Sequence, residues 1–282
     1  MKKILANFFR SVKEISLPLR MKLRKNASYK PLSGKKDGVV VSLTSFPARI
    51  GNVWVALDSL FRQDRVPDRI VLVLTEEEFP GGLSDLPESV LRFIPCGVEI
   101  VFLPFNLRCH NKYWWPFAFC PDATVITVDD DSEYRKDTVS RLLDISKKYP
   151  WAVCCNIAAV IDPGNFNTYS SWKKSSSPSA PGNLNVALGF AGVLYPPSVD
   201  RTPFLDRDLA MSLSSTADDL WLKAVELDRE IPVARGDFFP KPVTIKSSQA
   251  VSLRKVNKGT ENRNDIQWKA LDGHFHLKEK VK

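Results

Sequence analysis

Short apolar runs that alternate with helical segments constrain this chain more than any other feature. The runs are Gly38–Thr44, Arg69–Thr75, Val98–Leu103, Ala123–Val128 and Trp151–Ile157, and segments of helical periodicity include Ile50–Gln63 and Asp137–Tyr149. Strands that are apolar throughout are buried on both faces, and strands that alternate with helices form parallel sheets. The sequence therefore predicts an α/β fold with a mostly parallel central sheet flanked by helices. Ligands of such sheets bind at the carboxyl ends of the strands.

The second half of the chain is less regular. Its expected elements are a long Ser-, Pro- and Asn-rich loop over Asn165–Asn185, a strand in Val186–Leu194, a helix over Thr216–Leu227, a strand over Ile231–Arg235 and a helix over Glu261–Leu271. A loop of that length is often functional, and here it is a candidate lid. We expect residues 37–282 to form a single catalytic domain, with a nucleotide-binding half at about 37–135 and an acceptor half at about 136–282.

The positive charge of the chain is concentrated at its N-terminus. The net charge is +8, and residues 1–36 hold eleven Lys and Arg but a single acid, which gives +10 and leaves −2 for the remainder. A basic body that binds nucleic acid is therefore disfavoured. The 44% hydrophobic content is ordinary for a globular protein, and five cysteines without a C-x-x-C pair suggest reduced thiols in the cytoplasm.

Residues 1–36 read as a basic amphipathic leader and a linker. Over residues 2–16 one helical face carries Ile4, Leu5, Phe8, Phe9, Val12 and Ile15, and the other carries Lys2, Lys3, Arg10 and Lys13. Pro18 is expected to end this helix, and Lys22–Lys36 reads as the linker. Such a helix can lie on an anionic membrane surface, or its apolar face can dock on the main domain. The first alternative predicts a peripheral protein at the inner face of the plasma membrane.

The triplet Asp129-Asp130-Asp131 follows directly on the apolar strand ATVITV. Clustered carboxylates repel one another and take up protons unless a positive charge compensates them. A divalent cation does so well, because hard cations prefer carboxylate oxygen. The alternative is a solvated acidic turn that caps the following helix.

A second acidic pair, Asp218-Asp219, stands at the beginning of a predicted helix. An acid there can simply stabilise the helix dipole, or, close to a metal-binding triplet, it can serve as a general base. His274 and His276 could join a metal or phosphate site, and Lys112 could contact a phosphate. The sequence contains neither a G-x-G-x-x-G nor a P-loop motif, nor a nucleophile elbow.

Six blocks in this order resemble bacterial glycosyltransferases of the GT-A type, in particular family-2-like enzymes of capsule and lipopolysaccharide synthesis. The blocks are VVVSLTSFPAR, LDSLFRQ, DRIVLVL, VITVDDDSEY, GFAGVLYPP and ADDLWLKAVEL, and they extend from about residue 38 to about residue 235. The leader and the last 45 residues or so are outside the resemblance.

The resemblance implies a role for each block. Asp129 and Asp131 correspond to the outer acids of a D-x-D motif that holds Mn²⁺ or Mg²⁺, and Asp130 would face the donor sugar or ribose. Thr44, Ser45, Arg49, Glu76, Glu77 and Lys112 would contact the donor nucleotide, and Gly192 would line the site on its acceptor side. Asp219 or Asp218 would be the catalytic base. A third metal ligand has no clear equivalent, and His274 or His276 are the candidates.

The expected activity is a metal-dependent, inverting transfer of a sugar from a nucleoside-diphosphate donor to a hydroxyl of a surface-polysaccharide or lipid-linked acceptor. One alternative is a nucleotidyltransferase acting on a sugar phosphate, which would normally show a Gly-rich basic loop after the first strand. Another is a non-enzymatic membrane-associated assembly protein, which leaves the two acidic clusters without a purpose.

Overall fold

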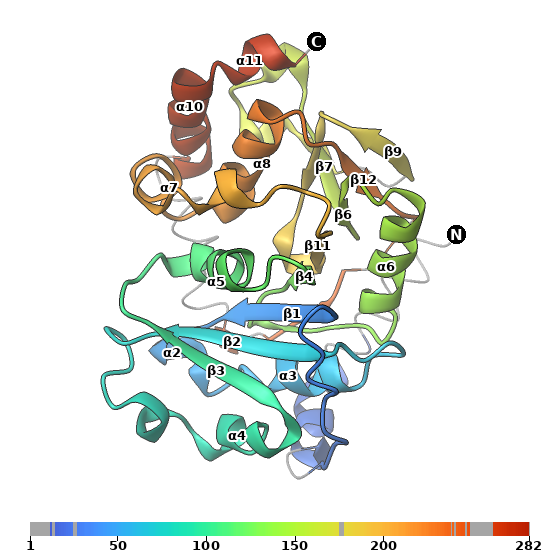
Figure 1. Ribbon diagram of the computed structural model, residues 1–282, viewed down its shortest axis with the longest axis vertical. Coiled ribbons are helices and arrows are strands. Elements are labelled where there is room, and N and C mark those ends of the chain that lie inside the picture. Colours follow the sequence, from blue (N-terminus) through green and yellow to red (C-terminus); the bar gives the residue numbers. More distant parts are fainter. Residues whose placement is uncertain are drawn as a thin grey trace.

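A mostly parallel eight-stranded sheet forms the centre of the protein (Figure 1). The computed structural model describes residues 12, 15–24, 27–174, 178–237, 239, 241–245, 247–248 and 262–281. In sheet order the strands are β3 (Val98–Leu103), β2 (Arg69–Thr75), β1 (Val39–Thr44), β4 (Thr124–Thr127), β11 (Val193–Tyr195), β6 (Val153–Cys155), β12 (Val233–Arg235) and β9 (Ser179–Gly182). Only β11 and β9 run antiparallel to their neighbours in this sheet.

Short strands outside the main sheet complete the β structure. They are β10 (Asn185–Ala187), β7 (Ala158–Val160) and β8 (Lys173–Lys174) in one small sheet, and β13 (Val243–Thr244) with β5 (Ser132–Glu133) in another. The helices are α2 (Pro47–Ile50), α3 (Trp54–Phe61), α4 (Glu88–Leu91), α5 (Asn111–Phe119), α6 (Thr138–Lys148), α7 (Arg207–Ser214), α8 (Asp218–Asp228), α10 (Arg263–Phe275) and α11 (Leu277–Lys280).

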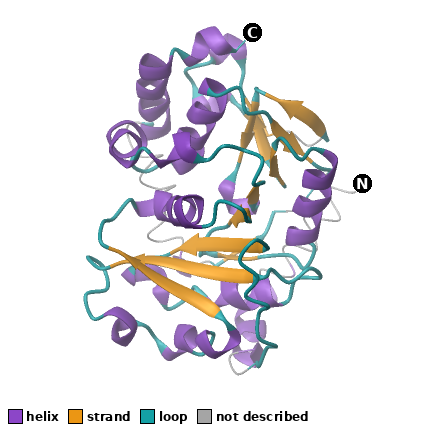
Figure 2. Ribbon diagram, viewed as in Figure 1, coloured by secondary structure: helices purple, strands orange, loops and turns teal. Residues whose placement is uncertain are grey.

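Helices cover both faces of the sheet, as the continuous apolar strands predict (Figure 2). Alternate residues of β1 show why: Val41 packs in the cluster that includes α3 and α4, whereas Val40 packs in the cluster beneath α5. A further cluster joins β6, β11, α8 and α10. In Figure 1, α5 lies on one side of β1 and β2, and α3 and α4 lie on the other.

The register of β1 and β4 brings the candidate site residues together. These two strands pair in parallel, with Ser42 opposite Thr127. Their carboxyl ends therefore lie side by side. The loop that begins at Thr44 is next to the turn that begins at Asp129.

Three sequence predictions on secondary structure need correction. The helix expected over Ile50–Gln63 is two short helices, α2 and α3, because Gly51 and Asn52 are poor helix formers. The strand expected in Val186–Leu194 is split into β10 and β11, since Gly192 adopts a φ of 91°, which favours glycine. The loop expected over Asn165–Asn185 contains β9, which pairs with β12 at the edge of the sheet.

Pro18 does not end the N-terminal helix. Residues 15–24 are helical, so the helix also includes the start of the expected linker. Tertiary contacts offset the hydrogen bond that proline removes, because Leu17 is buried in the core and Arg20 pairs with Glu133. Most of the helix expected over residues 2–16 lies outside the described residues. Within the described part of the chain, no helix combines the length and the apolar character needed to cross a bilayer.

Candidate active site

A cavity of about 930 Å³ opens at the carboxyl ends of β1 and β4. It is lined by residues that follow these two strands and by the beginnings of α5, α8 and α10. It brings together most of the residues singled out in the sequence: Thr44, Ser45, Arg49, Lys112, Asp129, Asp130, Asp131, Asp218 and Asp219. The two acidic clusters, almost ninety residues apart in the sequence, thus share one cavity.

The three aspartates of the turn after β4 have different environments. Asp130 is buried, where it accepts hydrogen bonds from Ser45 Oγ at 2.7 Å and from Arg49 Nη1 at 2.8 Å. Burial raises the pKa of Asp130 to about 6, against the opposing effect of Arg49. The side chains of Asp129 and Asp131 are 30% and 14% exposed, and Asp131 lies 3.4 Å from Arg49 Nη1. Asp130 therefore fastens the turn to the loop after β1, and its two neighbours are the more exposed members of the triplet.

Tyr134 fixes the backbone of the turn that carries Asp129, Asp130 and Asp131, which we call the acidic turn. Its hydroxyl oxygen accepts a hydrogen bond from the backbone N–H of Asp129 at 2.7 Å, and the hydroxyl donates to the carbonyl of Asp129 at 3.2 Å. The backbone N–H of Tyr134 donates to Ser59 Oγ in α3 at 3.0 Å. The tyrosine of the DDDSEY block is thus a positioning residue for the first aspartate.

Lys112 connects the two acidic clusters. Its Nζ lies 2.7 Å from Asp129 Oδ1 and 2.8 Å from Asp218 Oδ2. Although burial opposes ionisation, the neighbouring carboxylates raise the pKa of Lys112 well above its usual value. The amine therefore stays charged, and it stabilises both carboxylates in their ionised form.

Asp218 and Asp219 differ strongly although they are adjacent at the beginning of α8. Burial opposes the ionisation of Asp218, but the charge of Lys112 outweighs it and lowers the pKa of Asp218. Burial and then repulsion by Asp218 raise the pKa of Asp219 to about 8. Asp219 Oδ1 accepts a hydrogen bond from the backbone N–H of Gly189 at 3.0 Å. This arrangement gives one carboxylate committed to an ion pair and one that exchanges its proton near neutral pH.

Gly189 is the glycine of the GFAGVLYPP block that approaches the site. A Cβ at this position would lie 2.9 Å from Asp219 Oδ1 and 3.2 Å from Lys112 Nζ. Gly192, which the sequence suggested, does not line the cavity, and its nearest neighbours are Leu142, Thr138 and Asn156. Close approach of the backbone to two charged side chains thus explains a glycine at position 189.

Replacing Gly189 by Ala should displace Asp219 and Lys112 and lower kcat/KM of the sugar transfer that the sequence predicts by about tenfold or more, because small misplacements of groups in an active site are costly. Steady-state kinetics on the purified variant measure this effect. Gly273→Ala in α10 is the matched control, since a Cβ there meets nothing within 4 Å and alanine favours a helix. Equal losses of kcat/KM in the two variants, or no loss in Gly189→Ala, would contradict a role of Gly189 in positioning Asp219 and Lys112.

No family model matches the sequence, and no curated protein matches it. Solved structures do match the fold. Glucosyl-3-phosphoglycerate synthase from Mycobacterium tuberculosis, in complex with Mg²⁺ and uridine diphosphate, is 13% identical over 84% of this chain and 79% of that one, with a TM-score of 0.50. The chain has a GT-A-type fold. This confirms the fold that the sequence predicts.

Two further structures illustrate the range of similar proteins. The S. aureus TarS fragment 1–349 is 12% identical over 84% of this chain and 72% of that one, with a TM-score of 0.49. The 4-diphosphocytidyl-2C-methyl-D-erythritol synthase from Anaerococcus prevotii is 11% identical over 79% of this chain and 100% of that one, with a TM-score of 0.46. At such identities the likeness is one of fold, so the function must be argued from the cavity.

Other expected residues lie elsewhere in this GT-A fold. Glu76 and Glu77 are exposed and do not line the cavity, whereas Glu78, which accepts a hydrogen bond from Thr75 Oγ1, does. His274 and His276 are exposed near the end of α10, and neither lines the cavity. They do not form the expected extended segment, because His276 has a φ of 54° between two helices. We therefore assign neither histidine to a metal site.

The cavity also has lining residues that sequence reasoning missed. They are aromatic or carry amide and cationic groups: Asn106, Arg108, Tyr169, Trp172, Phe190, Lys241, Asn262, Arg263 and Asn264. Most of them are on loops or element ends whose position depends on tertiary structure. Only the aromatic content of the segment around Tyr169 could have signalled a ligand surface.

The donor set of the cavity fits a metal that arrives with its substrate. The described residues hold no cluster of three or more His, Cys, Asp or Glu placed to bind a metal ion. Asp129 and Asp131 nevertheless present hard oxygen donors from one turn. Mg²⁺ typically binds through one or two carboxylates, several waters and substrate phosphates rather than in a protein cage. Two carboxylates without a third ligand match that pattern.

Proposed function

We propose that this protein transfers a sugar from a nucleoside-diphosphate donor to an acceptor hydroxyl, with Mn²⁺ or Mg²⁺ as cofactor. The observation that carries the proposal is the meeting of Asp129, Asp131 and Asp219 in one cavity at the strand ends of a GT-A-type fold. In this arrangement Asp129 and Asp131 bind the metal, and Asp219 takes the proton of the acceptor hydroxyl. The expected enzyme class is accordingly a glycosyltransferase.

The donor is assigned to the end of the cavity formed by the loops after β1, β2 and β4. Thr44, Ser45 and Arg49 line this end, with Glu78 in the place expected for Glu76 and Glu77. Asp129 and Asp131 would hold the metal. When bound, the metal stabilises the charge that develops on the leaving diphosphate.

The base is assigned to Asp219 rather than Asp218. Asp218 is ion-paired with Lys112, whereas Asp219 lines the cavity with a pKa near neutrality, which suits proton transfer from a hydroxyl. Gly189 orients Asp219 through its backbone N–H. A single displacement with a carboxylate base inverts the configuration of the transferred sugar.

The acceptor is assigned to the side of the cavity with aromatic and cationic residues. Tyr169, Trp172 and Phe190 line this side, and they could pack against sugar rings. Lys241 and Arg263 are exposed there, and neither forms an ion pair with another described residue. This surface suits a glycan acceptor that also carries negative charge, such as a surface polysaccharide or a lipid-linked sugar phosphate.

A thermal-shift panel tests the proposal. We expect one of the diphosphates UDP, GDP, CDP or dTDP to raise Tm only when Mn²⁺ or Mg²⁺ is present, because diphosphate and carboxylates share the metal. Stabilisation by the monophosphate CMP instead would contradict a diphosphate donor. The Asp131→Asn variant should lose this shift, and Asp144→Asn, an exposed aspartate of α6, should keep it. If no nucleotide stabilises the wild type under any condition, the proposal fails. Release of pyrophosphate from a sugar phosphate and a nucleoside triphosphate would instead identify a nucleotidyltransferase.

A further inference from the structure

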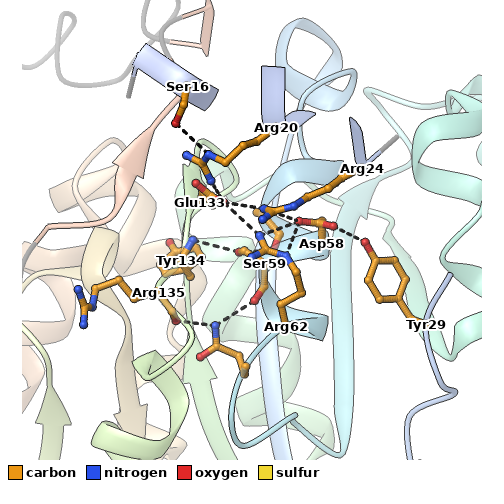
Figure 3. A network of polar contacts seen from close by, with 12 residues as sticks. Ser16, Arg20, Arg24, Tyr29, Asp58, Ser59, Arg62, Glu133, Tyr134 and Arg135 are labelled. Carbon is orange, nitrogen blue, oxygen red and sulfur yellow. Dashed lines mark hydrogen bonds and ion pairs between the residues drawn. The ribbon is translucent and has the colours of Figure 1, made fainter. Parts of the chain in front are cut away.

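The helix at residues 15–24 is firmly attached to the catalytic domain by one of its faces (Figure 3). Arg20 contacts Glu133, and Arg24 Nη1 lies 3.1 Å from Glu133 Oε1 and 3.8 Å from Asp58 Oδ2. Leu17 is buried in the core cluster of α3 and β1, and Met21 packs against the same cluster. We refer to the face with Leu17, Arg20, Met21 and Arg24 as the inner face.

Removing the inner face would leave buried charge behind. The side chains of Glu133 and Asp58 are nearly inaccessible, and in addition to Arg20 and Arg24 they share Arg62, whose Nη2 lies 3.1 Å from Glu133 Oε1 and 2.7 Å from Asp58 Oδ2. Tyr29 also donates to Asp58 (Figure 3). Buried carboxylates that lose cationic partners are strongly destabilising. The helix is thus a fixed part of the domain.

The opposite face of this helix is apolar and exposed. Val12, Ile15, Leu19 and Leu23 have 47%, 78%, 62% and 74% of their surface exposed. Ile15, Leu19 and Leu23 follow one another at spacings of four residues and so lie on one side of the helix, and Val12, three residues before Ile15, has the spacing expected for the same side. We refer to these four residues as the outer stripe. Large side chains exposed together in this way indicate an interaction surface.

The charge around the outer stripe identifies its partner. Residues 1–36 have a net charge of +10, whereas the rest of the chain has −2, and Lys22 is exposed beside the stripe. A second copy of the chain would bring two such basic segments together, and their repulsion opposes that contact. A bilayer with anionic headgroups offers both an apolar interior and the complementary charge.

We propose that the outer stripe docks on an anionic lipid surface, and that the contact of Arg20 and Arg24 with Glu133 transmits this docking to the catalytic domain as a fixed orientation. Glu133 precedes Tyr134, which holds Asp129, so the attachment point is adjacent to the acidic turn. The cavity is thereby held at a set position relative to the bilayer. This inference is independent of the reaction that the cavity catalyses.

Co-sedimentation of the full chain with vesicles tests the docking. The vesicles contain phosphatidylcholine, with or without phosphatidylglycerol. We expect the wild type to bind the phosphatidylglycerol vesicles, and the double variant Leu19→Glu with Leu23→Glu to bind at least about tenfold more weakly, because two apolar side chains leave the interface. Leu83→Glu is the matched control, since Leu83 is exposed to 49% at another place in the fold.

Several results would overturn the proposal. One is the absence of wild-type binding to the anionic vesicles, and another is equal binding of wild type and double variant. Light scattering supplies a third, namely a wild-type dimer that the double variant converts to a monomer, because the stripe is then a contact between copies. If the double variant does not fold, Lys22→Glu replaces it. The Lys22→Glu variant should bind more weakly than the wild type to the vesicles that contain phosphatidylglycerol, and its binding to vesicles without that lipid should not change. An unchanged affinity for the anionic vesicles would contradict the role of charge.

Discussion

The Asp131→Asn variant should have a transfer rate at least about a hundredfold below that of the wild type, with a higher metal concentration needed for half-maximal rate. The reason is that one of two carboxylates proposed for the metal is lost, and with it part of the stabilisation of the leaving diphosphate, which is worth several kcal/mol. Steady-state rates over a titration of Mn²⁺ or Mg²⁺ measure both effects. Asp144→Asn, a change at an exposed aspartate that does not line the cavity, should behave as the wild type.

Asp131 is a better choice for this experiment than its neighbours. Asp129 is paired with Lys112, and Asp130 with Arg49 and Ser45, at 2.7 to 2.8 Å, so their replacement would break close connections that hold the cavity together. Asp131 also contacts Arg49, but at the longer distance of 3.4 Å. A variant of Asp131 that retains wild-type rates and wild-type metal dependence would show that the triplet is a structural turn. The donor site would then have to be sought without a D-x-D motif.

Local patterns were sufficient to predict the part of the site that follows single strands. The apolar run of β4 and the acids behind it are contiguous, so the turn of Asp129 and Asp131 and its position at a strand end follow from the sequence. The same holds for Thr44 at the carboxyl end of β1. These elements depend on burial of their own residues, which a sequence displays directly.

Contacts between distant segments were not predictable in the same way. Lys112 pairs with Asp218, and Arg20 pairs with Glu133, more than a hundred residues away in each case. Each partner alone is an ordinary charged residue, and only the packing of α5 on the sheet or of the N-terminal helix on α3 brings the pair together. The choice between Gly189 and Gly192 is similar, because it depends on where β11 begins. The expectation for His274 and His276 was wrong in its assumption of an extended backbone.

The Asp219→Asn variant should have a lower transfer rate than the wild type and, at alkaline pH, a higher stability. The transfer rate should fall by about 10² to 10⁴, which is the usual contribution of a general base. In the wild type, kcat/KM should rise with pH towards about 8, since Asp219 must lose its proton to act. Measurement of kcat/KM from about pH 6 to about pH 9 would show this rise. A pH-independent kcat/KM would argue against Asp219 as the base.

The stability of the same variant should exceed that of the wild type at alkaline pH. In the unfolded chain Asp219 ionises near its ordinary pKa of 3.8, whereas in the folded protein it keeps its proton up to about 8. Between these values the folded state binds more protons than the unfolded state, so wild-type stability decreases as the pH rises through this interval. Asparagine does not ionise, and its carbonyl can still accept the hydrogen bond of Gly189. We therefore expect a Tm at least about 2–4 °C higher than that of the wild type near pH 9 in EDTA.

Asp218→Asn provides the opposite control, because the same substitution one residue earlier removes the carboxylate that pairs with Lys112. Its Tm should be lower than that of the wild type, since a buried amine then loses one of its two partners. Two neighbouring Asp→Asn changes with shifts of opposite sign cannot be explained by a general effect on the beginning of α8. They would identify burial and the charge of Asp218 as the cause of the raised pKa of Asp219. A Tm of Asp219→Asn at or below the wild-type value would show instead that Asp219 is already ionised in the folded protein, and a rise of kcat/KM towards about pH 8 would then need a different titrating group.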